Sequence, residues 1–285
     1  MSRGCLFPAA PTSRLRYCFE TMPDGRIPVV NDFNYVMNCL AEFPTLCIQA
    51  EHAYGRISMF MNREEFVPLF VSPVNLDAGS TDLSKAVQCH EVWAKLEECS
   101  CCGSSGEISF FNSFGLRFLQ ISAARDTDPR EWAQFLAMVA VAPRKELEPG
   151  EVKEPDEMPH PVMPAGAEEF NLSKMSFIKL LEKIAISEEM FQFTLPTSRF
   201  SLGRSFSLHQ IYEEDGCLVC HGNKVGYHLS LRAVRGFAVQ RIGGVETLYL
   251  LGNNQAVIFE ITMLKGGESV DVWHGILEAT RKSSL

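Results

Sequence analysis

The chain has 285 residues, 46% of them hydrophobic and 21% charged, so it is long enough for one large domain or two of about 140 residues each. This composition excludes a disordered chain and a disulfide-stabilised miniature. The formal net charge is −9 and there is no long basic run, which argues against general nucleic-acid binding.

The sequence predicts a cytoplasmic protein without membrane insertion. Residues 1–16 lack an uninterrupted apolar stretch, and no stretch approaches the roughly 18 apolar residues of a membrane-spanning helix. The ten cysteines are therefore expected to be reduced and to serve as small hydrophobic side chains.

The first half begins with the pattern of an amphipathic helix, followed by a strand over residues 55–60. Residues 76–106 read as an insertion, with a helix expected over residues 83–98 and a loop, CSCCGSSG, behind it. The cysteines in that loop have a poor spacing for structural zinc, so thiols without a metal are expected. The apolar helix positions are Phe33, Val36, Met37 and Leu40.

A hairpin and a helix complete the first half. Alternating apolar and polar residues over 107–112 and 116–121 flank a glycine turn, which is typical of two antiparallel strands. Asp128, Pro129 and Glu131 then supply a capping residue, a first-turn proline and a reciprocal carboxylate. These residues predict the start of a helix that carries Trp132.

Residues 143–164 contain six prolines among acidic residues, so neither a helix nor a central strand is expected there. This segment predicts a linker near the middle of the chain. Its position prompts a search for internal duplication.

The second half repeats the order of the first. A second amphipathic helix is followed by a hairpin over residues 246–251 and 256–261 and by a helix with Trp273. A fainter echo relates the segment from Gly55 to Phe66 with that from Gly226 to Phe237. The second helix has its apolar face at Phe177, Leu180, Leu181 and Ile184. The shared order favours duplication over chance similarity.

Cys217, Cys220 and His221 spell C-x-x-C-H, the attachment pattern of c-type haem. The surrounding residues are typical of a strand, in which positions three apart lie on opposite faces. The two thiols would then diverge, so covalent haem is not expected.

His209 differs from the other histidines in its context. It follows a segment, residues 199–208, that alternates large apolar and small polar groups and contains Arg199 and Arg204. That pattern is typical of a strand that faces a pocket, although an exposed strand histidine is the alternative. G-x-S-x-G, Walker A and G-x-G-x-x-G signatures are absent from the sequence.

The second half resembles the bacterial haem-utilisation carrier, or hemin-degrading factor, family. The similarity lies in residues 216–232, 236–241 and 245–253, and in the helix at Trp273. They follow the order of the family's G-x-W-x-N-V-L, F-N-L-H-L-R-E, V-V-R-K-P and T-S-L-E-L-F-D blocks and its final Trp helix. The resemblance covers residues 170–285 well and 30–140 weakly.

The resemblance implies an internal duplication in which antiparallel sheets are backed by helices and haem lies in a cleft between the halves. Where the family has a haem-ligating histidine before the second opening helix, this chain has residues 173–177, with Met175 as the nearest weak ligand. The family's distal arginine is also replaced, at residues 57–60. Arg232 keeps its residue type, opposite the L-R of H-L-R-E.

The sequence therefore predicts an α+β fold of two pseudo-repeat halves, each a large antiparallel sheet with helices on one face. The halves are residues 1–142 and 171–285, joined by a linker at 143–170. The expected function is non-catalytic binding of haem or a related tetrapyrrole, with His209 as the iron ligand. An oxidative haem-degrading enzyme and a haem-less interaction module are the alternatives, and a homodimer is left open. The expected propionate partners are Arg199, Arg204, Arg232 and Lys224.

Overall fold

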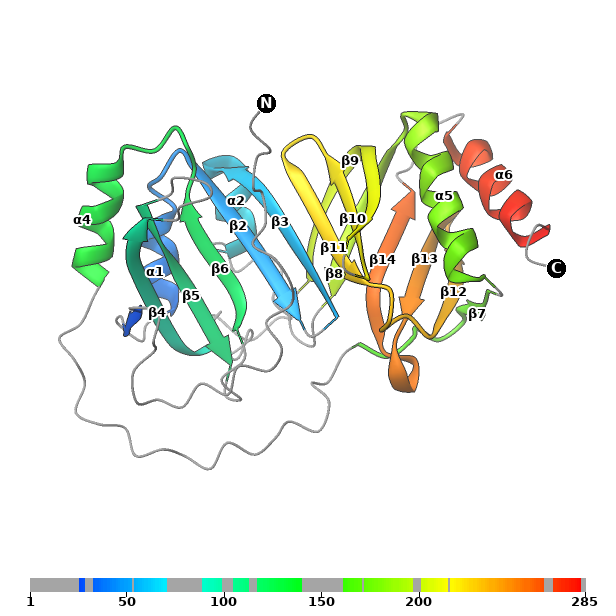
Figure 1. Ribbon diagram of the computed structural model, residues 1–285, viewed down its shortest axis with the longest axis horizontal. Coiled ribbons are helices and arrows are strands. Elements are labelled where there is room, and N and C mark those ends of the chain that lie inside the picture. Colours follow the sequence, from blue (N-terminus) through cyan, green and yellow to red (C-terminus); the bar gives the residue numbers. More distant parts are fainter. Residues whose placement is uncertain are drawn as a thin grey trace. The chain divides into compact units, whose positions relative to one another are not determined.

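The computed structural model describes residues 26–28, 33–52, 54–70, 89–98, 105–112, 117–139, 161–170, 172–196, 201–214, 216–263 and 269–282 (Figure 1). Contacts divide the chain into two compact units. The N-terminal unit comprises Met1–Ala50 and Ser58–Asp156, and the C-terminal unit comprises Glu51–Ile57 and Glu157–Leu285. The tip of the first hairpin thus belongs to the C-terminal unit.

The N-terminal unit contains one sheet with the strand order β1-β4-β5-β6-β2-β3. Neighbouring strands from β1 to β2 in this order pair antiparallel. In chain order, the elements are β1 (Arg26–Pro28), α1 (Phe33–Leu40), β2 (Thr45–His52), β3 (Gly55–Asn62), α2 (Arg63–Phe70), β4 (Cys89–Glu98), β5 (Ser105–Asn112), β6 (Arg117–Ala123) and α4 (Pro129–Val139).

The C-terminal unit contains strands in the order β7-β12-β13-β14-β8-β9-β10-β11, all paired antiparallel. Its elements are β7 (Glu168–Glu169), α5 (Lys174–Ser187), β8 (Met190–Pro196), β9 (Ser201–Glu214), β10 (Cys217–Gly222), β11 (Val225–Ser230), β12 (Gly236–Ile242), β13 (Val245–Leu251), the short 3-10 helix η2 (Asn253–Gln255), β14 (Val257–Met263) and α6 (Ser269–Lys282).

The strand orders confirm two pseudo-repeat halves. In the chain, a short strand precedes the opening helix of each unit. In the sheet, the last three long strands of the unit lie between that short strand and the two strands that follow the opening helix. Thus β4, β5 and β6 correspond to β12, β13 and β14, and β2 and β3 correspond to β8 and β9. The hairpin of β10 and β11 has no counterpart among the described residues of the N-terminal unit.

Helices cover one face of each sheet because each helix has a single apolar side. In the N-terminal unit, Trp132 of α4 is fully buried and its ring lies 5.1 Å from that of Phe43. In the C-terminal unit, α5 and α6 lie side by side on the sheet (Figure 1). Trp273 of α6 is likewise buried, 5.2 Å from the ring of Phe191. This arrangement confirms the α+β prediction.

Two details of the prediction are wrong. The helix expected over residues 83–98 is strand β4 from Cys89 onward, with its residues paired against β5; burial of Val92 and Ala94 follows the two-residue period of a strand. The echo between residues 55–66 and 226–237 also fails, because β3 corresponds to β9 rather than β11. Residues 83–88, the cysteine-rich loop at 99–104 and the linker at 143–160 lie outside the described residues. The limits assigned to the halves and to the linker stay predictions.

No helix among the described residues has both the length and the apolar character needed to cross a membrane.

Candidate functional site

The structure describes five of the six residues expected to bind a tetrapyrrole, including Lys224, which is exposed in the turn between β10 and β11. His209 is exposed on β9, and Arg204 is half-buried on the same strand. Arg232 is exposed in the turn after β11, and Met175 is 63% exposed in the first turn of α5. Arg199 lies outside the described residues.

These residues do not form one site. The guanidinium of Arg232 lies beside Gly216, just before β10, whereas His209 lies at the other end of β10, about six residues or 20 Å away. Met175 is also far from the β9 segment that carries His209. It lies at the N-terminal end of α5, whereas the C-terminal end of that helix, about 18 Å away, is next to β9. There the Glu188 carbonyl accepts a hydrogen bond from Ser207 of β9.

A β-bulge determines the direction of His209. In the pairing of β9 with β10, His221 is opposite Gln210 and Gly222 is opposite Leu208, so His209 is the extra residue. Leu208 is fully buried, whereas His209 and Gln210 are both exposed. The bulge therefore places two consecutive side chains on the face of β9 that is turned away from α5 and α6.

His209 shares this face with three other side chains that can donate a proton or bind a metal. Tyr212 pairs with Val219, and Val219 pairs with His228. Because alternate residues of a strand share a face, His221 lies on it too. We call this surface, formed by His209, Gln210, Tyr212, His221 and His228, the His–Tyr face.

Tyr212 and His221 form a pair across β9 and β10. The Tyr212 hydroxyl and His221 Nε2 are 3.2 Å apart, and the two rings stack with centroids 5.8 Å apart at 19°. Tyr212 is 43% exposed. Partial burial, followed by the charge of Glu214, raises the pKa of Tyr212, and burial lowers the pKa of His221. Both shifts favour the neutral pair.

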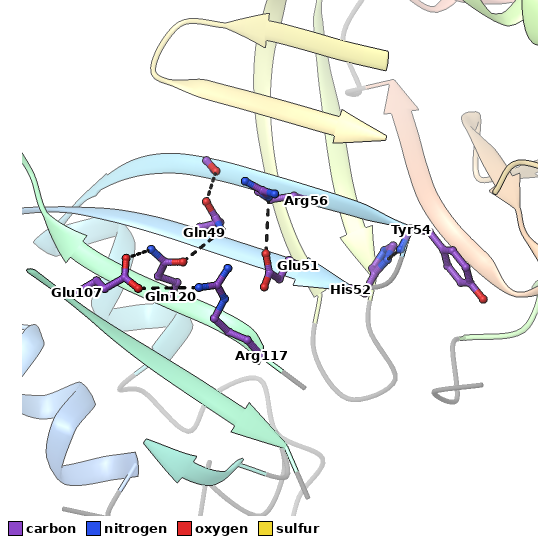
Figure 2. A network of polar contacts seen from close by, with 9 residues as sticks. Gln49, Glu51, His52, Tyr54, Arg56, Glu107, Arg117 and Gln120 are labelled. Atoms are coloured by element: carbon purple, nitrogen blue, oxygen red, sulfur yellow. Dashed lines mark hydrogen bonds and ion pairs between the residues drawn. The ribbon is translucent and has the colours of Figure 1, made fainter. Parts of the chain in front are cut away.

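His228 and Arg56 border this pair. Burial first, then the charges of Arg56 and His221, lowers the pKa of His228 to about 4. The Arg56 side chain is only 10% exposed, and its Nε lies 3.7 Å from Glu51 (Figure 2). Arg56 is thus a largely buried cation close to neutral imidazoles.

Hydrogen bonds hold the hairpin tip that carries Arg56 to the rest of the C-terminal unit. His52 Nδ1 accepts from the Tyr54 amide at 3.1 Å, so a neutral His52 carries its proton on Nε2 and donates it to the Ile258 carbonyl, also at 3.1 Å. The Tyr54 carbonyl accepts from the Ser230 amide at 2.9 Å. These bonds fix Arg56 relative to β11.

The polar residues in the N-terminal unit form a hydrogen-bonded network of a structural kind (Figure 2). Gln49 donates to Gln120 and accepts from Ser58, both at 3.4 Å. Gln120 donates to Glu107, which also lies 3.9 Å from Arg117. These groups satisfy one another, so the network explains how a half-buried sheet face tolerates polar side chains.

The cysteines of the C-x-x-C-H pattern lie on a strand, as predicted. Cys217 and Cys220 belong to β10, and three positions along a strand place their side chains on opposite faces. Burial raises the pKa of the Cys220 thiol to about 12, so this thiol is unreactive. Among the described residues, no group of three or more His, Cys, Asp or Glu side chains could hold a metal ion.

The site that the structure assembles was only partly predicted. The sequence singled out His209, and it noted His221 only as part of the C-x-x-C-H pattern. Tyr212 and Arg56 were missed. The register of the β9–β10 hairpin, closed near Glu214 and Gly216, was the signal that would have brought Tyr212 to His221.

The fold is similar to that of bacterial proteins of known structure. PhuS, a haem-binding protein from Pseudomonas aeruginosa, matches with a TM-score of 0.66 and 13% identity, over 90% of this chain and 86% of its own. ChuS, a haem-degrading enzyme from Escherichia coli O157:H7, matches with a TM-score of 0.69 and 14% identity over the same shares. No protein-family model matches the chain, and no curated protein matches it in sequence. These likenesses confirm the fold that the sequence resemblance implied.

Proposed function

We propose that the chain binds haem or a related tetrapyrrole and carries it without changing it chemically. The observation that supports this most strongly is the similarity in fold, over 90% of the chain, to PhuS, a haem-binding protein. A cytoplasmic location is part of the proposal.

The His–Tyr face has the chemistry that this ligand requires. Imidazole and phenolate are both established ligands of haem iron, and the face carries three histidines and a tyrosine. His209, exposed on the bulge, is the proposed imidazole ligand. A bound haem would supply an iron centre with an open coordination position.

Cations near this face would pair with the propionates. Lys224 is exposed in the turn between β10 and β11, two residues after Gly222, and therefore lies near the bulge. Arg56 lies at the other side of the face, beside His228. Arg204 and Arg232, the other described candidates, would contact a propionate only at a different position on the unit. Charge-assisted hydrogen bonds to carboxylates are the interactions expected of Lys224 and Arg56.

A titration with hemin, followed by its Soret band, tests the proposal. Replacement of His209 by Ala is expected to weaken the affinity by more than tenfold, which is about 1.4 kcal/mol. The control is His274→Ala on α6, where the imidazole instead contacts Arg241 at 2.9 Å. Weak, non-saturating binding by the wild type and both variants would show that haem is not the ligand and would favour an interaction module.

Oxidative degradation of haem is the second candidate function. It is favoured by the likeness in fold to ChuS, a haem oxygenase from E. coli, with a TM-score of 0.66, 13% identity and coverage of 90% of this chain and 89% of its own. Aerobic incubation of the hemin complex with ascorbate separates the two functions. A carrier leaves the bound haem intact, whereas an oxygenase bleaches the Soret band and releases iron that a chelator can detect.

A further inference from the structure

We propose that His52 is a pH-sensitive latch for the hairpin tip, Glu51–Ile57, which belongs to the C-terminal unit. A neutral His52 holds the tip in that unit, and uptake of a proton by the imidazole releases it. This inference concerns the chain alone and does not depend on a bound ligand.

Both ring nitrogens of His52 take part in the latch. Nδ1 accepts a hydrogen bond from the Tyr54 amide, and Nε2 donates one to the Ile258 carbonyl of β14, each at 3.1 Å. The first bond shapes the tip, and the second fastens it to a strand that lies 206 residues further along the chain. A neutral imidazole has one acceptor nitrogen and one donor nitrogen, so this geometry requires the neutral ring.

The ring of His52 is also enclosed. Its residue is 7% exposed, and the ring lies edge-on to that of Tyr54 with centroids 5.9 Å apart (Figure 2). A Cβ on Gly55 would lie 3.5 Å from His52 Cε1 and 3.1 Å from the His228 carbonyl of β11. The tip backbone therefore packs closely against β11 beside the latch, and a charge on the ring would have little access to water.

Protonation removes the acceptor that the tip needs. An imidazolium donates from both nitrogens, so its Nδ1–H would point at the Tyr54 N–H, which is a donor as well. The proton comes from water, and its charge would reside in a buried site where the loss of hydration disfavours it. The docked tip therefore accepts only the neutral form of His52.

The charged groups nearby offer little compensation for a cationic His52. Those on the elements around the latch are Glu51, Tyr54 and Arg56 on the tip, His228 on β11 and Glu260 on β14. The Glu51 carboxylate lies 3.7 Å from Arg56 Nε, so it already has a cation beside it. His228, whose pKa is about 4, is neutral above about pH 5. Burial raises the pKa of Glu260, so this carboxyl loses its charge at a higher pH than usual.

Release breaks the bonds of the tip to both β14 and β11. The Tyr54 carbonyl accepts from the Ser230 amide at 2.9 Å, and Arg56 lies close to His228 only while the tip is docked. A histidine in water takes up a proton near pH 6.5, so the released tip binds more protons than the docked tip below this pH. Release should therefore become about thirtyfold more favourable between pH 8 and pH 5.

Hydrogen exchange of the ligand-free full chain, followed by NMR from pH 8 to pH 5 and corrected for the intrinsic exchange rate, tests the latch. The reporter is the Ser230 amide, whose acceptor is on the tip, and the reference is the Leu248 amide within β13. Protection of Ser230 should fall about thirtyfold relative to Leu248. His52→Gln should show protection that is independent of pH, because its side-chain amide donates to a carbonyl but does not titrate.

His274→Gln on α6 is the control and should behave as the wild type, since His274 contacts Arg241 and not the tip. The latch is wrong if wild-type protection of Ser230 is the same at both ends of the pH range, or if His52→Gln loses protection at low pH as the wild type does. An equal loss at Ser230 and Leu248 would indicate global unfolding and would also overturn the proposal. Because hemin is not used, none of these results bears on the proposed function.

Discussion

Gly222→Ala is expected to destabilise the protein strongly, because the packing beside the bulge leaves no room for a methyl group. A Cβ at this position would lie 1.8 Å from Cδ2 of Phe206, whereas carbon atoms in contact are about 3.5 to 4.0 Å apart. The Phe206 ring would have to move by about 2 Å. It is only 4% exposed, stacks on Tyr227 at 12° and packs 4.6 Å from the ring of Phe193.

The expected loss is about 3 kcal/mol of the free energy of unfolding, at the upper end of typical overpacking costs. Urea unfolding followed by circular dichroism measures it. The matched control is Gly236→Ala on β12, where the nearest atom to the new Cβ is Leu251 Cδ1 at 4.0 Å; this change should be neutral or slightly stabilising. A loss below about 0.5 kcal/mol for Gly222→Ala would refute the packing that we describe around the bulge.

Three further predictions concern the C-terminal unit. Haem should be fully extracted from the denatured complex, with no pyridine-haemochrome signal left on the chain, because Cys217 and Cys220 lie on opposite faces of β10; retained haem would contradict this. The pKa of His228 is lowered from 6.5 to about 4, so between these pH values the unfolded chain binds more protons than the folded chain. The free energy of unfolding should therefore fall as the pH drops through this range, by on the order of 2 kcal/mol after allowance for partial exposure. His228→Gln should flatten this part of the urea-derived stability profile, and an unchanged slope would refute the assignment. Ser173→Ala removes the cap whose hydroxyl accepts from the Ser176 amide at 3.0 Å, and should lower the free energy of unfolding by about 1 kcal/mol in urea titrations; no change would show that the cap does not contribute.

The fold could be predicted where local patterns are strong. The hairpins at β5–β6 and β13–β14 alternate clearly around a turn, and the helix of Trp132 begins with a recognisable capping signal, since Asp128 accepts a hydrogen bond from the Arg130 amide. Strand β4 was missed because a ten-residue strand that contains Lys95, Glu97 and Glu98 also fits a helical pattern, and its pairing with β5 is a tertiary effect. The echo between Gly55 and Gly226 was misplaced for another reason: both glycines lie in strands, and only the strand order shows that β3 corresponds to β9 rather than β11.

The site could be predicted only in part, since it depends on register. His209 was recognised from the pattern of its own strand, but a bulge and two cross-strand pairings place it beside Tyr212 and His221. Arg56 reaches this face from a hairpin tip more than 150 residues earlier in the chain. Long-range pairings of this kind leave little trace in local periodicity.

Native mass spectrometry of the wild-type protein after addition of one equivalent of hemin tests the central claim most directly. We expect a single predominant species with one haem per chain, which denaturation converts to the bare chain. No second haem is expected at moderate excess. An unmodified chain after incubation, or a ladder of successive haem adducts without saturation, would contradict the claim that this fold carries a specific haem site.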